Sequence, residues 1–152
     1  MTFRRAFTIL EILVVLAVFA LLATLAVISL NSARASMRDA QRLSDISVMR
    51  AALSQYWLDK ATYPESGGVE LGMPGTNTDV FGSAGFAGAA DSSQTLYLQR
   101  VPTGPRSGEY YRYKGSSSGY SIRFKTETRT DLGPANVYYA HQSGIDGEDV
   151  EK

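Results

Sequence analysis

The hydrophobic pattern of the chain is concentrated near its start. From Ile12 to Leu30 only Thr24 and Ser29 are polar, and no charged residue follows Glu11 until Arg34. A helix needs about 20 predominantly apolar residues to span a bilayer, and this run is of that length. The pattern therefore predicts one membrane-spanning helix, and the more polar sequence that follows it indicates a soluble domain.

The helical pattern continues past the apolar run and becomes one-sided. No glycine or proline occurs from Asn31 to Lys60. Apolar residues recur at steps of three and four, which predicts one buried face: Leu43, Ile46, Met49, Leu53 and Trp57. Charged residues are expected on the other faces: Arg38, Arg42, Asp45, Arg50 and Asp59. Pro64 ends the pattern, so we expect one helix over residues 7–58 with an apolar half and an amphipathic half.

The second half of the chain carries a long loop pattern and then strand patterns. Residues 65–92 hold seven of the 14 glycines and few apolar residues, which predicts an irregular connection. Three β-prone runs follow, at residues 109–114, 120–125 and 136–140. A few short strands need another layer for stability. We therefore expect an α+β fold, in which the long helix packs on a small antiparallel sheet of about three strands.

Composition narrows the possible chemistry. The 15 basic and 15 acidic residues give a formal net charge of zero, which argues against a nucleic-acid-binding surface. The absence of cysteine excludes disulfides and thiolate chemistry. His141 is the only histidine, has no motif around it, and is expected at the surface or a strand end. Six of the nine tyrosines lie between Tyr110 and Tyr139, where we expect sheet packing with hydroxyls at the surface. No catalytic set is evident, so an enzyme is not predicted.

The last residues form an acidic tail with the sequence SGIDGEDVEK. Oxygen ligands clustered in this way can bind Ca²⁺, and we predict Asp146 and Asp149 as ligands together with nearby backbone carbonyls. The spacing is not that of an EF-hand. A solvated acidic terminus is the competing interpretation.

The amino terminus allows three interpretations. A cleaved secretory signal has a basic start and an Ala-x-Ala site, as at Ala33 and Ala35, but its apolar region is about 7–15 residues and has no use for Glu11. A plain single-pass anchor tolerates Glu11 near one interface. Arginines flank both ends of the apolar run, so the positive-inside rule does not orient such an anchor.

The third interpretation explains the glutamate. The stretch from Arg4 through Ala6, Phe7 and Glu11 resembles the prepilin signal of type IV pilins and type II secretion pseudopilins. The resemblance implies cleavage between Ala6 and Phe7, followed by N-methylation of Phe7. Glu11 then becomes the fifth residue and pairs with the Phe7 amine of a neighbouring subunit. Ala6 departs from the usual glycine before the cut.

Later segments add to the resemblance. The helix end and the following Tyr63-Pro64, and the LYLQRVPTGP segment, are similar to those of major pseudopilins, whose C-terminal loop holds calcium. The implied function is a structural filament subunit that polymerises with itself. The implied partners are a prepilin peptidase, an inner-membrane platform, an assembly ATPase and, before assembly, membrane lipid. The alternative is a single-pass membrane-anchored binding module that does not polymerise.

The expected organisation follows from these patterns and from the resemblance. The segments are a leader (1–6), a transmembrane and filament-core helix (7–33), an amphipathic helical half (34–60), a helix-to-sheet loop (61–108), an antiparallel sheet (109–141) and an acidic tail (142–152). The resemblance places the protein first in the inner membrane with its head outside the cytoplasm, and then in a periplasmic or extracellular filament.

Overall fold

The structure is a computed structural model that describes residues 8–152, so the predictions made for Ala6 and Phe7 lie outside the described residues. Its first element is the 52-residue helix α1 (Ile9–Lys60). The helix ends where Ala61 adopts a left-handed φ of 53° and donates its N–H to the Trp57 carbonyl at 2.8 Å. Residue contacts divide the chain into two units, one ending at Ala35 and the other beginning at Ser36.

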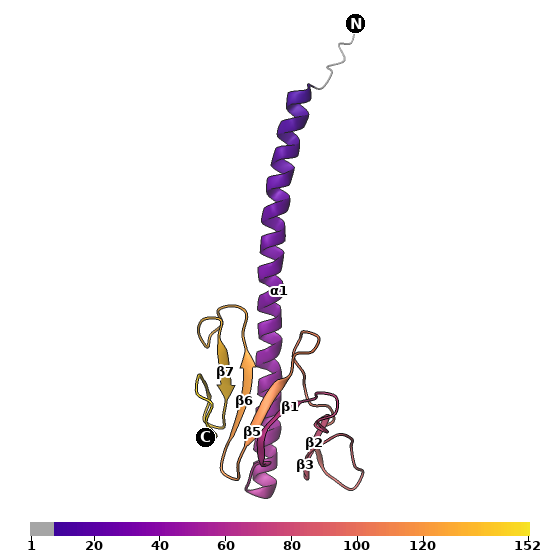
Figure 1. Ribbon diagram of the computed structural model, residues 1–152, viewed down its shortest axis with the longest axis vertical. Helices are drawn as coiled ribbons and strands as arrows, with labels where there is room; N and C mark the ends of the chain where they lie inside the picture. Colours follow the sequence, from indigo (N-terminus) through magenta and orange to yellow (C-terminus); the bar gives the residue numbers. More distant parts are fainter. Residues whose placement is uncertain (1–7) are drawn as a thin grey trace. The chain divides into compact units, whose positions relative to one another are not determined.

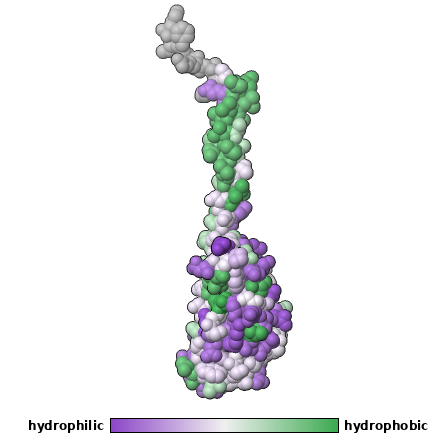
Figure 2. All heavy atoms as spheres, turned by 90° about the vertical axis from the view of Figure 1, so that its left-hand side faces the viewer, coloured by the Kyte–Doolittle hydropathy of each residue, from purple (hydrophilic) through white to green (hydrophobic). Residues whose placement is uncertain are grey.

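In the first unit the described residues are helical from Ile9 onward, and their side chains face outward. Ile9 is 81% exposed and Leu30 is 50% exposed, and the large apolar residues between them are similarly accessible. This part of the helix is long and apolar enough to cross a membrane. Figure 2 shows the apolar residues covering it on the visible side.

The second unit contains two antiparallel sheets (Figure 1). The larger sheet has the strand order β1-β5-β6-β7-β8: β1 (Ser66–Leu71), β5 (Tyr111–Gly115), β6 (Tyr120–Lys125), β7 (Val137–Ala140) and β8 (Ile145–Asp146). The smaller sheet has the order β3-β2-β4: β2 (Val80–Gly82), β3 (Gly85–Ala87) and β4 (Leu96–Leu98). The predicted α+β class, with one long helix on antiparallel strands, is confirmed.

The hydrophobic core lies between α1 and one face of the larger sheet. Ile46, Met49 and Leu53 of the helix are almost fully buried, together with alternate residues of β5 and β6 such as Tyr113 and Ile122. Period-2 alternation therefore identified the inward face of these two strands correctly. Aromatic rings extend the core toward the smaller sheet, where Tyr56 stacks on Phe81 with ring centroids 5.4 Å apart.

Two predictions about the strands need correction. The larger sheet has five strands rather than about three, and residues 65–92 form β1, β2 and β3 instead of an irregular connection. The sequence pattern was misleading because several of these glycines have roles within or beside strands. Gly68, at a φ of 122°, lies in a β-bulge between Ser66 and Val69, and Gly85, at a φ of 96°, begins β3. Glycines that resemble loop residues in the sequence thus permit a bulge and a tight reversal.

The buried face of α1 is also shifted from the predicted one. Leu43 and Trp57 are only partly buried, whereas Asp39 and Arg42 are 1% and 2% exposed. Arg42 was expected on a solvated face. Its burial is possible because carboxylates on distant segments surround its guanidinium group.

The expectation for the tyrosine hydroxyls and for His141 is likewise only partly met. The hydroxyl of Tyr111 donates to Asp45 at 2.8 Å, and that of Tyr113 donates to the Pro64 carbonyl at 2.8 Å, so these hydroxyls are satisfied inside the protein. His141 follows β7, at a strand end as predicted, but it is fully buried beside the Tyr120 carbonyl.

Candidate functional site

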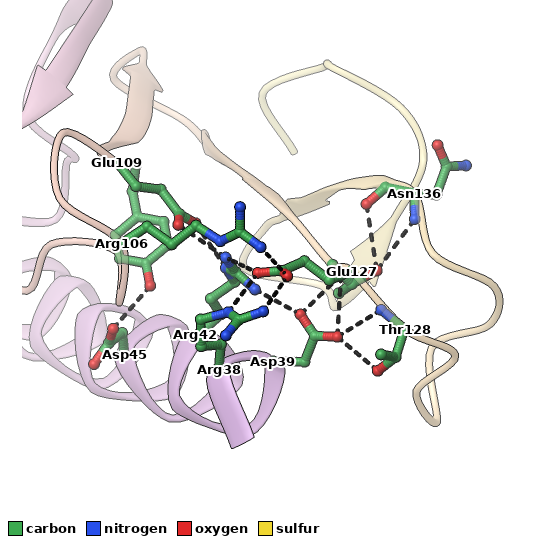
Figure 3. Close-up of polar contacts among 11 residues, drawn as sticks. Arg38, Asp39, Arg42, Asp45, Arg106, Glu109, Glu127, Thr128 and Asn136 are labelled. Carbon is green, nitrogen blue, oxygen red and sulfur yellow. Dashed lines mark hydrogen bonds and ion pairs between the residues drawn. The ribbon is translucent and has the colours of Figure 1, made fainter. Parts of the chain in front are cut away.

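A cluster of charged side chains joins α1 to the segments on either side of the β5–β6 hairpin (Figure 3). Arg42 is at its centre. The Arg42 Nε donates to Glu109 at 2.6 Å, one terminal nitrogen donates to Glu127 at 2.7 Å, and the other donates to Asp39 at 2.7 Å. Glu109 precedes β5 and Glu127 follows β6. We call this group, together with Arg38, Arg106 and Thr128, the Arg42 cluster.

Asp39 connects the helix directly to the backbone after β6. It accepts hydrogen bonds from the N–H of Glu127 at 2.9 Å, from the N–H of Thr128 at 2.7 Å and from the Thr128 hydroxyl at 2.7 Å. Glu127 in turn accepts from Arg38 at 2.9 and 2.5 Å and also pairs with Arg106. Three carboxylates and three guanidinium groups thus balance one another.

The cluster keeps its carboxylates ionised. The bonds from Arg38 hold the pKa of Glu127 far below its usual range despite partial desolvation, with Arg42 and Arg106 adding to the effect. Burial raises the pKa of Asp39, but the hydrogen bonds from Glu127 and Thr128 outweigh burial, and the net pKa is lowered. The pKa of Arg42 is raised, chiefly by the bond to Glu109. Groups held so firmly in one ionisation state are suited to holding structure together rather than to transferring protons.

The membrane-competent end of α1 contains the predicted assembly residue Glu11. Thr8 precedes the helix, and its hydroxyl accepts a hydrogen bond from the Glu11 N–H at 3.2 Å. This is the first half of a capping box, and it places Glu11 in the first turn, where the helix dipole favours an acidic side chain. Farther along, the Thr24 hydroxyl donates to the Ala20 carbonyl at 2.8 Å, which satisfies a polar group within the apolar stretch.

The two predicted calcium ligands in the acidic tail contact different partners. Asp146 contacts the His141 ring at 3.2 Å, the Glu148 N–H at 2.9 Å and the Lys152 ammonium at 2.9 Å. The bond from Lys152 is the main reason that the pKa of Asp146 is lowered to about 2. Asp149 instead accepts from the Ser121 hydroxyl at 3.0 Å. Within residues 8–152, no three metal-binding side chains are gathered in one place.

The comparison with protein families addresses the amino terminus. The model of the prokaryotic N-terminal methylation motif matches residues 1–27. The chain carries a prepilin-type signal. This signal covers Ala6, Phe7 and Glu11 together with most of the apolar run, and it is the signal of type IV pilins and pseudopilins. No curated protein and no solved structure matches the chain.

The prepilin-type signal and the fold are consistent with each other. The signal indicates a precursor processed by a peptidase, and a long helix on antiparallel sheets is the layout of the type IV pilin-like fold. Membrane anchoring fits both the signal and the apolar end of α1. The sequence predicted Glu11 as an assembly residue through this motif, and that role stays a prediction. The sequence did not reveal the Arg42 cluster, because charged residues at helical spacing are usually solvated.

The Arg42 cluster predicts a specific acid sensitivity. Because the folded state lowers the pKa of Glu127, the stabilisation is fully present above the unfolded-state pKa near 4.5 and is lost as the pH falls below it. In the fragment spanning residues 36–152, the urea-unfolding free energy should hold between neutral pH and about pH 4.5 and should fall steeply below about pH 4.5. Glu127→Gln should lose roughly 2–3 kcal/mol at neutral pH and show a shallower pH dependence.

Asp131→Asn is the matched control, because Asp131 is exposed and makes no ion pair within the described residues. It should keep the wild-type profile. If Glu127→Gln and Asp131→Asn show the same pH dependence, the acid sensitivity does not come from the cluster.

Proposed function

We propose that the protein is a structural subunit of a type IV pilus-like or type II secretion pseudopilus filament, assembled through the first part of α1. The observation that carries the proposal is the coincidence of the prepilin-type signal with a helical surface that has no internal cover. The large apolar residues from Ile9 to Leu30 are all about half exposed or more, and no described residue of their own unit, from residue 8 onward, buries them.

Such a surface requires an apolar environment at every stage. Burying apolar area stabilises by about 25 cal/mol per Å², so the helix partitions first into lipid. In a filament the same side chains would be covered by helices of neighbouring subunits. The subunit would therefore exist as a single-pass protein of the inner membrane, with its head outside the cytoplasm, before it joins a periplasmic or extracellular polymer.

Glu11 would supply a directional contact between subunits. An acidic residue at the centre of a membrane helix costs roughly 2.5–3.5 kcal/mol, so a carboxylate in this helix needs a partner or a function. Cleavage before Phe7 would create an α-amino group four residues from Glu11. The amine of one subunit could pair with Glu11 of another that is staggered along the filament. A prepilin peptidase, a membrane platform and an assembly ATPase would serve this pathway.

The first test is processing. Protein isolated from the native membrane should begin at Phe7 and carry a methyl group on its amine, because Ala6 and Phe7 lie inside the matched signal. Intact-mass measurement decides this directly. An uncut chain favours the alternative of an anchored binding module that does not polymerise, and a start at Ser36 favours an ordinary secretory signal.

The second test is assembly. Glu11→Ala should insert and be cleaved, because it makes the helix more apolar and keeps the backbone N–H that Thr8 caps. It should nevertheless give few filaments, since a neighbour's amine would be buried without a counter-charge. Glu11→Asp should be intermediate because its carboxylate reaches less far. The measurement compares membrane-bound and sheared-filament protein.

Glu65→Ala serves as the control for loss of an acidic side chain, since Glu65 is exposed on the second unit. Its filament yield should equal that of the wild type. A normal filament yield from Glu11→Ala would show that the carboxylate is not an assembly contact.

We also propose that the acidic tail binds calcium through Asp146 and Asp149. The ion would replace Lys152 on Asp146 and draw Asp149 toward it. Calcium at one hundred times its dissociation constant should stabilise the fragment spanning residues 36–152 by roughly 2.7 kcal/mol in thermal melting. The Asp146→Asn, Asp149→Asn double variant should lose this response, and Asp131→Asn should retain it. If calcium does not change the melting temperature of the wild-type fragment, the tail is a solvated segment that does not bind calcium.

A further inference from the structure

The side of the larger sheet that faces away from α1 carries a basic surface. The strand register aligns one residue from each strand in a row: Glu70, Arg112, Arg123, Tyr139 and Asp146. Two residues along their strands, Lys114 and Lys125 point to the same side as the two arginines. Arg112, Arg123 and Lys125 are exposed. We call this surface the outer face.

The two central arginines are direct cross-strand neighbours. Like charges at such positions destabilise a sheet pair. Within the described residues, no carboxylate lies within ion-pair distance of Arg112, Arg123 or Lys125. In the Arg42 cluster, by contrast, each arginine is paired with a carboxylate. The outer face therefore presents positive charge that the described part of the chain does not neutralise.

The backbone of β1 makes room for one of these arginines. A Cβ atom on Gly68 would come within 2.8 Å of two guanidinium nitrogens of Arg112, and Gly68 lies in the β-bulge. A cavity of about 300 Å³ lies beside this contact, lined by Gly67, Arg112, Lys114, Arg123, Tyr139 and Asp149. The glycine in the bulge thus leaves space for the Arg112 guanidinium group at the wall of an open pocket.

The acidic tail already touches this surface. Asp149 lines the pocket and accepts from Ser121 of β6, and Glu151 pairs with Lys114 of β5 at 3.1 Å. These two acidic residues are separated by one residue. In an extended peptide, alternate side chains are roughly 6.8 Å apart, which is also the spacing of Arg123 and Lys125 along β6. Lys114 and Ser121 are direct cross-strand partners, so the tail places two alternate carboxylates on one cross-strand pair of the outer face.

We propose that the outer face is a docking site for a short, extended acidic peptide of a partner protein, with carboxylates at alternate positions. Arg112, Arg123 and Lys125 bind those carboxylates, and the chain's own Asp149 and Glu151 compete for the same surface. Glu70 and Asp146 lie at the two ends of the row and repel a longer polyanion that crosses the sheet, which disfavours nucleic acid. The proposal does not depend on polymerisation.

The test uses the full chain in a nonionic detergent, at low ionic strength and with a calcium chelator present. The probe is a fluorescent peptide of alternating glutamate and glycine, and binding is followed by anisotropy. The Arg112→Ala, Arg123→Ala double variant should weaken binding roughly fivefold or more, because two of the three proposed ion pairs to the peptide are lost. The Asp149→Asn, Glu151→Gln double variant should bind more tightly because the competing carboxylates are gone.

The matched control is Arg100→Ala, Arg129→Ala, which removes two exposed arginines that make no ion pair among the described residues. Its affinity should equal that of the wild type, and circular dichroism establishes that every variant is folded. If the alanine pair unfolds, glutamine at Arg112 and Arg123 replaces it. Equal binding of a glutamine–glycine peptide overturns the proposal, as does equal competition by duplex DNA or anionic vesicles. An unchanged affinity of the Arg112→Ala, Arg123→Ala variant also overturns it, as does an unchanged affinity of the Asp149→Asn, Glu151→Gln variant.

Discussion

The second unit depends on the neutralisation of one buried guanidinium group. Arg42 is 2% exposed, and it can remain there only because Asp39, Glu109 and Glu127 bind it from three directions. A buried charge that loses its partners is strongly destabilising, so the three segments that supply these carboxylates must be in place together. Electrostatic pairing thus fixes how α1 meets the β5–β6 hairpin, and apolar packing fills the remaining contact.

The contacts that α1 makes with the rest of the second unit change in kind along the helix. Near Ser36 the contacts of α1 are ionic and directional, whereas from Ile46 to Tyr56 they are apolar and aromatic. Ion pairs tolerate little displacement, while side chains of similar volume can often be exchanged within an apolar core. The first turns of the second unit therefore define the position of the helix, and the later turns contribute most of the buried surface.

Much of the fold was accessible from the sequence because its main features are local. The absence of glycine and proline through Lys60 predicted the long helix, and alternation along β6 identified its buried face. The short, glycine-rich strands β1 to β3 have no such periodicity. The Arg42 cluster was missed for another reason: its carboxylates Glu109 and Glu127 lie 67 and 85 residues away in the chain. Glu11 could be predicted as an assembly residue because its motif is contiguous, whereas the contacts of Asp146 and Asp149 are set by tertiary packing.

The position of the Arg42 cluster has a mechanical consequence. Tension applied to the apolar part of α1 travels along the continuous helix and reaches Asp39 and Arg42 within the first two turns of the second unit. Ionic bonds from Arg42 to two separate loops, at Glu109 and Glu127, act there in parallel, so the load is shared before it reaches the aromatic packing around Tyr56. When the second unit is pulled through its helix, the ion pairs of the Arg42 cluster therefore bear the load before the hydrophobic core does.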